Sequence, residues 1–249
     1  MKKYTLYALL FVLLACTKTE VQVTKITGKR IAIDSTNASD KTIEDFIIPY
    51  RKKLQQNMQK ELCVAPFNFV KNDGTLQSSL GNLMADLSYE MANPVFKEIA
   101  HTNIDFVLMN NGGLRAPIPK GVVTTENAFL LMPFENELVV TKLSGQKVKA
   151  LFDYFVAKQK AHPLSKQVNL TLQKNTYTLN INGKAFDEKK SYYVLTNDYL
   201  QTGGDGMNFF ANPEALIPLN YKVRNAIIDY FTKVDRLEKT IDNRVIVKP

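Results

Sequence analysis

The chain has 249 residues and the composition of a folded protein: 45% of the residues are hydrophobic and 22% are charged, with a net charge of +8. A chain of this length and apolar content can bury a full core, which excludes a disordered protein and predicts one domain or two small ones. The lysines are scattered along the chain. A solvated basic surface is therefore a better interpretation than a groove for nucleic acid.

The first residues, MKKYTLYALLFVLLAC, predict an export signal. Lys2 and Lys3 precede an apolar run over residues 4–14, which is too short to span a membrane comfortably. The sequence LLAC resembles a bacterial lipobox, so we expect residues 1–15 to be a lipoprotein signal peptide and Cys16 to carry a lipid. The expected location is the bacterial cell envelope, with the lipid anchoring the protein to a membrane. An ordinary signal peptide with an incidental cysteine is the alternative.

The rest of the chain predicts a tether and first strand over residues 16–36, followed by one domain over residues 37–249. The strand is expected in VQVTKITGKRIAID, where polar and apolar residues alternate. Two amphipathic helices are expected at residues 39–62 and 78–99. The apolar residues of the first are expected in the core or at a seam, and those of the second lie broadly on one side. The next expected elements are a buried strand from residue 104, a short helix with Thr125 as N-cap, a strand at 137–144, and a helix with Ser144 as N-cap.

The second half of the chain is mostly β until near its end. Alternation predicts strands at residues 168–173, 176–181 and 191–200, with NGK as a hairpin-like turn. A helix at 220–234 and an edge-like strand at 243–249 complete the chain. Intermixed helices and strands without an interdomain linker predict a single α+β domain. Cys63 is expected to be a small buried apolar residue.

Three loop segments carry side chains suited to a nucleoside. NNGGLRAPI places Asn110 and Arg115 around two glycines at the end of a strand, and LMPFENE holds Phe134 in a proline-marked turn. NDYLQTGGDGMNFF sets Tyr199 before a glycine-rich turn around Asp205. Two rings can enclose a base, an amide can pair with its edge, a carboxylate can accept from ribose hydroxyls, and a guanidinium can contact phosphate. Taken singly, each residue also fits a plain structural role in the core, a turn or a surface ion pair.

Five blocks in this order resemble the C-terminal, substrate-binding domain of the 5'-nucleotidase family: LGNLMADL, NNGGLRAPI, TTENAFLLMPFENELVV, LSGQKVKALFDYF and NDYLQTGGDGMNFF. The resemblance spans residues 80–210. It implies a four-layer α/β/β/α sandwich whose loops clamp the nucleoside part of a nucleotide.

The resemblance also implies a role for each of these substrate-binding residues: Asn110, Arg115, Phe134, Tyr199, Gly203, Gly204 and Asp205. Phe134 and Tyr199 match the family's base-stacking aromatics, with Tyr199 in place of a more usual phenylalanine. Asn110 matches the contact with the base edge. Arg115 matches an arginine near the phosphate, and Asp205 matches the aspartate that holds the ribose hydroxyls. The two glycines let the turn close beside the sugar.

Two features depart from the family pattern. Where members often carry arginines ahead of the GNL block, this chain offers only Lys71. The family hydrolyses the phosphate ester with an N-terminal metallophosphatase domain, in which several His and Asp residues hold two divalent metals. This sequence has only His101 and His162, and both are expected to be structural. We therefore expect no catalytic residue, metal site or cofactor in this chain.

Two functions of different classes remain. The first is the nucleotide- or nucleoside-recognition half of a split 5'-nucleotidase, which works with a separately encoded metallophosphatase chain in nucleotide dephosphorylation. The divalent metals are then expected in that partner. The second is a non-catalytic nucleoside-binding lipoprotein of the envelope. For both, the expected partners are a nucleotide or nucleoside and, through the lipid anchor, a membrane.

Overall fold

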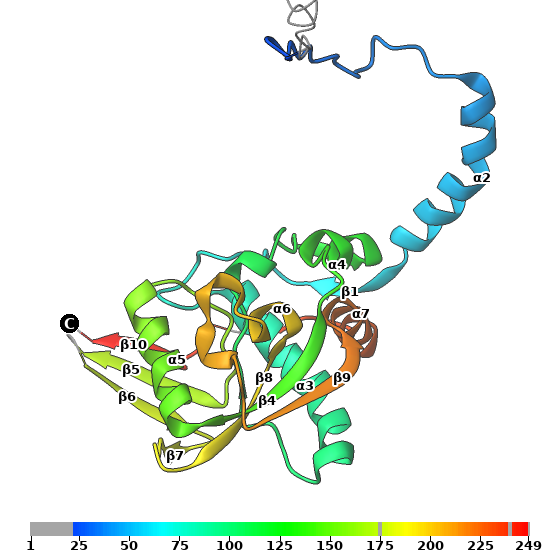
Figure 1. Cartoon of the computed structure of the whole chain (residues 1–249). Helices are drawn as coiled ribbons and strands as arrows, with labels where there is room; N and C mark the ends of the chain where they lie inside the picture. The colour runs from blue at the N-terminus through cyan, green and yellow to red at the C-terminus, as the bar shows by residue number, and fades with distance from the viewer. Residues whose placement is uncertain (1–21, 174–175, 239–240, 249) are drawn as a thin grey trace, which may run out of the picture. The chain divides into compact units, whose positions relative to one another are not determined.

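A computed structural model of the protein describes residues 22–173, 176–238 and 241–248 (Figure 1). The chain divides into two units, Met1–Ile48 and Pro49–Pro249. The predicted signal peptide and Cys16 lie outside the described residues. Across the described parts of the chain, no helix is both long enough and apolar enough to cross a membrane.

The described part of the first unit contains no strand. Residues 22–33 have no regular structure, so the strand predicted in VQVTKITGKRIAID is wrong. Alternation produces a strand only where neighbouring strands supply hydrogen-bond partners and a face to bury. Helix α2, Lys41–Met58, begins in this unit and ends in the second. None of its residues is buried within the described chain, so the core interpretation of its apolar residues is wrong, while the alternative, a seam, stays a prediction.

The second unit holds the remaining helices and strands of the described chain. The α-helices are α3 (Ser79–Ala100), α4 (Thr125–Leu131), α5 (Gly145–Lys158), α6 (Asp198–Gln201) and α7 (Val223–Lys233). The strands are β1 (Glu61–Ala65), β2 (Phe106–Val107), β3 (Gly121–Thr124), β4 (Glu137–Ser144), β5 (Val168–Gln173), β6 (Thr176–Ile181), β7 (Lys184–Ala185), β8 (Ser191–Asn197), β9 (Ala215–Lys222) and β10 (Val245–Lys248). Short 3-10 helices are η1 (Asn111–Gly113), η2 (Gly204–Gly206) and η3 (Asn208–Phe210).

The strands form two four-stranded sheets and one two-stranded sheet, in the orders β2-β8-β4-β9, β10-β5-β6-β7 and β1-β3. In the first sheet, β2 runs parallel to β8, and β4 runs antiparallel to both β8 and β9. In the second, β6 pairs with β5 and, across the predicted NGK turn, with β7, while β10 lies parallel to β5 at the edge. Asn182 and Gly183 both have positive φ, as a tight hairpin turn requires.

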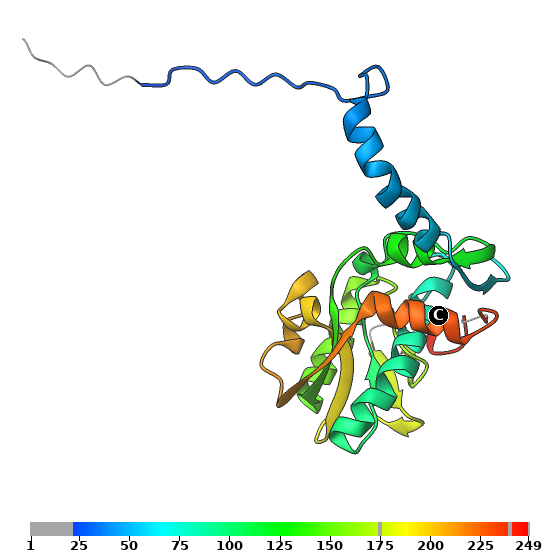
Figure 2. The same cartoon turned by 90° about the vertical axis from the view of Figure 1, so that its right-hand side faces the viewer.

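Two hydrophobic cores lie on opposite sides of the β2-β8-β4-β9 sheet. Helices α3 and α7, which lie side by side in Figure 2, pack on one face and bury residues such as Leu83 and Ile227. The other core joins this sheet to α5 and to the sheet of β5 and β6, with Phe106 and Phe152 at its centre. Helices and two sheets therefore share one unit, and the predicted α+β class is confirmed.

Several element boundaries differ from the predictions. Leu62 lies in β1 rather than at the end of a helix, because the chain leaves the helix after Met58 and pairs with β3. The N-cap of α4 is Thr124 rather than Thr125, and the Asn127 side chain accepts a hydrogen bond from the Thr124 N–H at 2.8 Å. Strand β9 was not predicted. It contains Pro218, which an edge strand tolerates.

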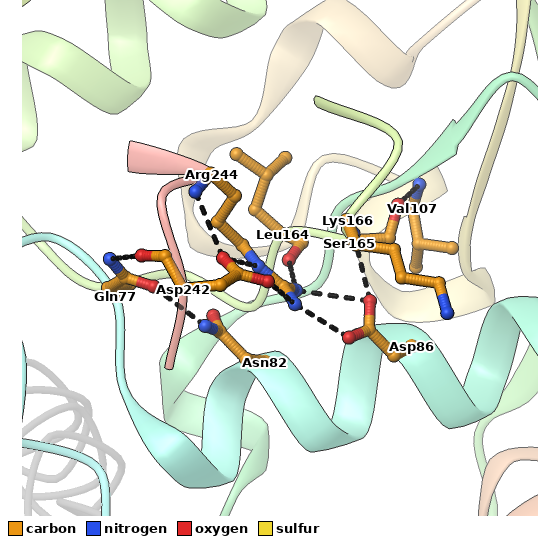
Figure 3. A network of polar contacts seen from close by, with 9 residues as sticks. All are labelled: Gln77, Asn82, Asp86, Val107, Leu164, Ser165, Lys166, Asp242 and Arg244. Carbon is orange, nitrogen blue, oxygen red and sulfur yellow. Dashed lines mark hydrogen bonds and ion pairs between the residues drawn. The ribbon is translucent and has the colours of Figure 1, made fainter. Parts of the chain in front are cut away.

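A buried arginine fastens the last strand to helix α3 (Figure 3). Arg244 is only 2% exposed, and its guanidinium pairs with Asp86 and Asp242 and donates to the Leu164 carbonyl at 2.7 Å. Gln77 adds a hydrogen bond to the Asp242 carbonyl at 2.8 Å. Because the buried cation has both charged partners and a carbonyl acceptor, the network fixes β10 against α3.

Candidate functional site

A cavity of about 320 Å³ opens where three loops of the second unit meet. It is lined by Asn110, Gly112, Gly113, Arg115, Met132, Phe134, Asn136, Asn197, Tyr199 and Asp205. Five of the seven predicted substrate-binding residues are in this set. Gly203 and Gly204 are not, because they shape the turn behind Tyr199 and Asp205.

The order and direction of the strands bring the three loops together. Strands β2 and β8 are parallel, with Val107 paired to Leu195, so the loops that follow both strands leave the sheet at the same edge. Strand β4 is antiparallel to β8 and starts there, with Leu138 opposite Asn197. The turn before β4 therefore joins the other two loops. Loops at one edge of a rigid sheet are well placed to present side chains to a ligand.

Asp205 is held in the cavity by hydrogen bonds to both its side chain and its backbone. Its Oδ1 accepts a hydrogen bond from the Tyr199 hydroxyl at 3.0 Å, and its Oδ2 accepts from Asn110 Nδ2 at 2.8 Å. The Tyr154 hydroxyl donates to the Asp205 carbonyl at 2.9 Å. Each carboxylate oxygen can accept more than one hydrogen bond, so the fixed carboxylate retains capacity for hydroxyl groups of a ligand.

The glycine-rich turn is needed to hold Asp205 in this position. Asp205 has a φ of +54° and Gly203 a φ of +96°, both in the left-handed region. A Cβ on Gly204 would lie 2.5 Å from Cε1 of the Tyr199 ring, so only glycine lets the turn pack against that ring. The hydroxyl that distinguishes Tyr199 from a phenylalanine contacts both the carboxylate and, at 3.3 Å, the N–H of Asp205.

Two large aromatic side chains face the cavity while remaining substantially exposed. Phe134 is 41% exposed and Tyr199 is 45% exposed. Exposed rings at a hollow surface are ready to contact a flat ligand, since burying them on binding removes apolar area from water. The Arg115 guanidinium lies 5.9 Å from the centre of the Phe134 ring, which places a cation at the same end of the cavity.

Arg115 also lines a second cavity of about 420 Å³ on the neighbouring surface, together with Lys71. Lys71 Nζ donates a hydrogen bond to the Leu114 carbonyl at 2.9 Å, so it is fixed beside the loop that carries Arg115. The lysine noted in the sequence as the only cation ahead of the GNL block therefore lies close to the predicted phosphate-binding arginine.

Sequence reasoning missed Arg224, which supports the turn of Phe134 from helix α7. Arg224 is 8% exposed, and its Nη1 donates to the carbonyls of Met132 and Phe134 at 3.2 and 3.3 Å. Its Nη2 pairs with Glu135, which lowers the pKa of that carboxyl, and its guanidinium lies 4.2 Å from the centre of the Phe129 ring. No local motif marks this residue, because its partners are far away in the sequence.

Asn136 and Asn197 also line the cavity without having been predicted. Asn136 Nδ2 donates to Asp198 Oδ1 at 2.8 Å, and Asn197 Oδ1 accepts the Leu200 N–H at 2.9 Å as the N-cap of α6. The first contact joins the turn that carries Phe134 to the segment that carries Tyr199, and the second fixes the start of α6. Asparagines at loop positions are so common in turns that residue type alone does not identify such a role.

The two histidines lie in different environments. His101 is exposed and caps the end of α3 in a left-handed conformation. His162 is 3% exposed, and its Nδ1 accepts the Asn111 N–H at 3.2 Å. Burial, together with the nearby Lys160 charge, lowers the pKa of His162 to about 4. Among the described residues, no group of three His, Cys, Asp or Glu side chains is placed to hold a metal ion.

The fold defines an α+β domain with a cavity where three loops meet, and comparison with known proteins identifies its family. The chain belongs to the family described as "5'-nucleotidase, C-terminal domain", which matches residues 57–212. Protein UshA of Salmonella pullorum is 29% identical over 175 residues, covering 63% of this chain and 31% of that protein. The 5'-nucleotidase of Vibrio vulnificus is 25% identical over 186 residues, covering 72% of this chain and 32% of that protein.

Solved structures agree on the fold. The crystal structure of the 5'-nucleotidase precursor from Thermus thermophilus superimposes with a TM-score of 0.68 at 20% identity, covering 84% of this chain and 44% of that one. The chain spans about a third of the length of the two curated relatives named above. The family match ends at residue 212, so β9, α7 and β10 follow the matched segment.

Proposed function

We propose that this chain is the nucleotide-recognition half of a 5'-nucleotidase, and that a separately encoded metallophosphatase chain carries out the hydrolysis. One observation carries the proposal. Three loops bring Phe134, Tyr199, Asn110, Arg115 and Asp205 to a single cavity of about 320 Å³. Two rings, an amide, a cation and a carboxylate are the groups that a nucleotide requires for its base, phosphate and ribose.

The contacts within the cavity suggest how the ligand lies in it. The base stacks between the exposed rings of Phe134 and Tyr199. One N–H of the Asn110 amide is engaged by Asp205, which leaves the other N–H and the carbonyl oxygen for the base edge. The ribose hydroxyls donate to Asp205. The 5'-phosphate then extends toward Arg115, beyond which Lys71 lines the adjoining cavity.

The proposal assigns the metal-dependent step to the partner because of where the histidines of this chain lie. His101 ends a helix at the surface, and the Nδ1 of His162 is engaged by the Asn111 N–H in a buried site. In the proposed pair, the metallophosphatase would hold divalent metals, which would supply activation of the attacking oxygen. This chain supplies binding and orientation of the nucleotide, which lower the barrier by fixing the reacting group in place.

Phosphate release from AMP tests the division of labour. The assay compares this chain alone, a candidate metallophosphatase chain alone, and both together, in the presence of Mg²⁺, Mn²⁺ or Zn²⁺. We expect release to rise only for the pair, and to fall back when Asp205→Ala replaces the native chain. Release by this chain alone would contradict the need for a partner. Adenosine binding without stimulation of any phosphatase would support the non-catalytic binding lipoprotein instead.

We further propose that a lipid on Cys16 holds the protein at a membrane of the cell envelope, in keeping with the LLAC sequence. Labelling of the expressed protein with a radioactive fatty acid tests this proposal. The native chain should be labelled and should partition into detergent. The Cys16→Ser variant should not be labelled and should not partition into detergent. Equal labelling of both forms would refute the anchor and leave an ordinary signal peptide as the explanation.

A further inference from the structure

A second polar cavity shares Asp205 with the nucleoside cavity. It has a volume of about 260 Å³ and is lined by Tyr154, Lys158, Lys160, His162 and Asp205. The first two of these residues belong to α5, and the next two follow the end of that helix. Asp205 is the one lining residue that the two cavities have in common, so a ligand group in the second cavity would lie next to the first.

The lining of this cavity is positively charged. Lys158 Nζ lies 5.6 Å from the centre of the Tyr154 ring, and the ion pairs within the described part of the chain include neither Lys158 nor Lys160. The opposing charge comes from Asp205. Its two carboxylate oxygens already accept hydrogen bonds from Tyr199 and Asn110, which line the nucleoside cavity. The lining therefore contains two lysines and one carboxylate that is already engaged.

His162 adds a buried hydrogen-bond donor. Its Nδ1 accepts the Asn111 N–H, so in the neutral ring the proton is on Nε2. Nε2 is buried and makes no hydrogen bond of good geometry within the described chain, while a contact between the ring and the Met109 backbone opposes the lowering of the His162 pKa. Leaving a buried N–H unpaired costs free energy, and the lowered pKa of His162 keeps the ring in its neutral, single-donor form at neutral pH. An oxygen acceptor in this cavity would remove that cost.

We propose that the cavity formed by Tyr154, Lys158, Lys160 and His162 binds a phosphoryl oxyanion. The two ammonium groups supply charge, and the His162 Nε2–H supplies a neutral donor, a combination suited to the oxygens of a phosphate. The oxyanion is either inorganic phosphate or a phosphate on the ribose of the bound ligand.

The alternative that the oxyanion is a phosphate on the ribose of the ligand rests on the proposed function. If Asp205 accepts the ribose 2'- and 3'-hydroxyls, then the adjoining cationic cavity is on the hydroxyl side of the sugar. A 3'-phosphate replaces the 3'-hydroxyl, so only the 2'-hydroxyl would then donate to Asp205 while the phosphate enters the cationic cavity. The 5'-phosphate would extend toward Arg115. The domain would then distinguish nucleotides by the position of their phosphate. Stacking of the base between the two rings cannot make this distinction, and neither can the hydrogen bond from the 2'-hydroxyl to Asp205.

The first experiment tests the oxyanion site without any nucleoside. Amide NMR spectra of the chain from residue 17 onward, which contains both hydrophobic cores, are recorded during titration with inorganic phosphate at constant ionic strength. We expect saturable shifts at residues 154–162 and at least a tenfold weaker apparent affinity in Lys158→Ala/Lys160→Ala. The matched control is Lys184→Ala/Lys189→Ala, which removes two exposed lysines elsewhere and should bind phosphate like the native chain.

The second experiment identifies the source of the phosphate by calorimetry with adenosine, adenosine 3'-phosphate and adenosine 5'-phosphate. A nucleotide source predicts that the 3'-phosphate raises affinity about tenfold over adenosine, equivalent to about 1.4 kcal/mol, and that the double lysine variant removes this gain while adenosine affinity is kept. Saturable inorganic phosphate binding without that gain indicates the free anion as the ligand.

The two proposals fail in different ways. Absence of adenosine binding refutes the proposed function, while the titration with inorganic phosphate still decides the oxyanion site. Conversely, adenosine binding with no saturable phosphate shifts at residues 154–162, and with equal affinities for adenosine and its 3'-phosphate, overturns the oxyanion site and leaves the nucleoside cavity intact.

Discussion

Replacing Arg224 by methionine should loosen the turn that carries Phe134 and weaken nucleoside binding without removing any residue of the cavity. Arg224 lies in α7, yet its Nη1 donates to the carbonyls of Met132 and Phe134. Methionine keeps an unbranched apolar stem beside the Phe129 ring, so the substitution removes mainly the charged donors. The two carbonyls then lose their partner.

The expected loss of stability follows from these contacts. Hydrogen bonds to a charged group contribute about 1.5–3 kcal/mol, and the two bonds share one nitrogen at 3.2 and 3.3 Å. The guanidinium over Phe129 contributes about 0.5–1 kcal/mol, of which methionine recovers a part. The pair with exposed Glu135 adds little because solvent screens it. We expect the free energy of unfolding to fall by about 2–3 kcal/mol.

The effect on binding comes from the displaced ring of Phe134. A base stack contributes about 1–3 kcal/mol, so losing about half of one such contact lowers adenosine affinity by about two- to twelvefold. Urea denaturation measures the stability of the variant, and calorimetry below the unfolding transition measures its affinity. Glu135→Gln is the mild control, since it removes only the exposed ion pair and should alter stability by less than about 0.5 kcal/mol.

A second control separates stability from positioning. Arg244→Met breaks another buried arginine network, at β10 and α3, and should cost about 3–5 kcal/mol of stability. Its folded fraction should nevertheless bind adenosine like the native chain, because its contacts are outside the cavity lining. If Arg224→Met binds adenosine with native affinity despite its loss of stability, the turn is not positioned by Arg224 and the reasoning is refuted.

The remaining predictions concern the ring pair, the glycine turn and the buried histidine. Phe134→Ala/Tyr199→Ala should abolish measurable adenosine binding in calorimetry, and unchanged affinity would disprove the cavity. Gly204→Ala should destabilise the fold by more than about 1 kcal/mol and weaken binding because its Cβ meets the Tyr199 ring, whereas Gly206→Ala meets no atom within 4 Å and should show only the cost of its positive φ. The pKa of His162 is lowered to about 4 in the folded chain, so the unfolded chain binds more protons below pH 6.5. The free energy of unfolding should therefore fall by about 3 kcal/mol from pH 7 to pH 4. His162→Asn should make the free energy of unfolding, measured by urea denaturation, depend less on pH over this range.

The residues at the cavity were predictable because loop chemistry is local. The NNGG and GGDG segments mark turns at the ends of β2 and β8, and Asp205 and Gly203 indeed have positive φ. The resemblance to the family supplied the grouping that these turns alone do not give. The individual ligand roles of Asn110, Arg115 and Asp205 stay predictions, although the structure brings these side chains to one cavity.

The supporting contacts were not predictable, because they join segments far apart in the sequence. Arg224 in α7 donates to the Phe134 carbonyl, and Lys71 donates to the Leu114 carbonyl. In the sequence alone, neither residue differs from other basic residues of a helix or a loop. Their roles depend on which loops the strand order brings together, and pairing between distant strands is what a single sequence specifies least directly.

The errors in the fold have a related cause. Helical spacing continued to Leu62, but pairing with β3 takes that residue into a strand. Alternation in residues 21–34 suggested a strand, yet residues 22–33 have no strand partner within the described chain. Strand β9 contains Pro218 and was missed, although its place at a sheet edge accommodates proline. In each case tertiary pairing overrides the local pattern.

Calorimetric titration of the chain from residue 17 onward with adenosine tests the central claim most directly, when native protein and Asp205→Ala are compared at equal concentration. The account predicts saturable binding to a single site in the native chain and at least a tenfold loss in the variant, with circular dichroism spectra that coincide. Absence of adenosine binding, or equal affinity in the two proteins, would contradict a nucleoside site built around Asp205.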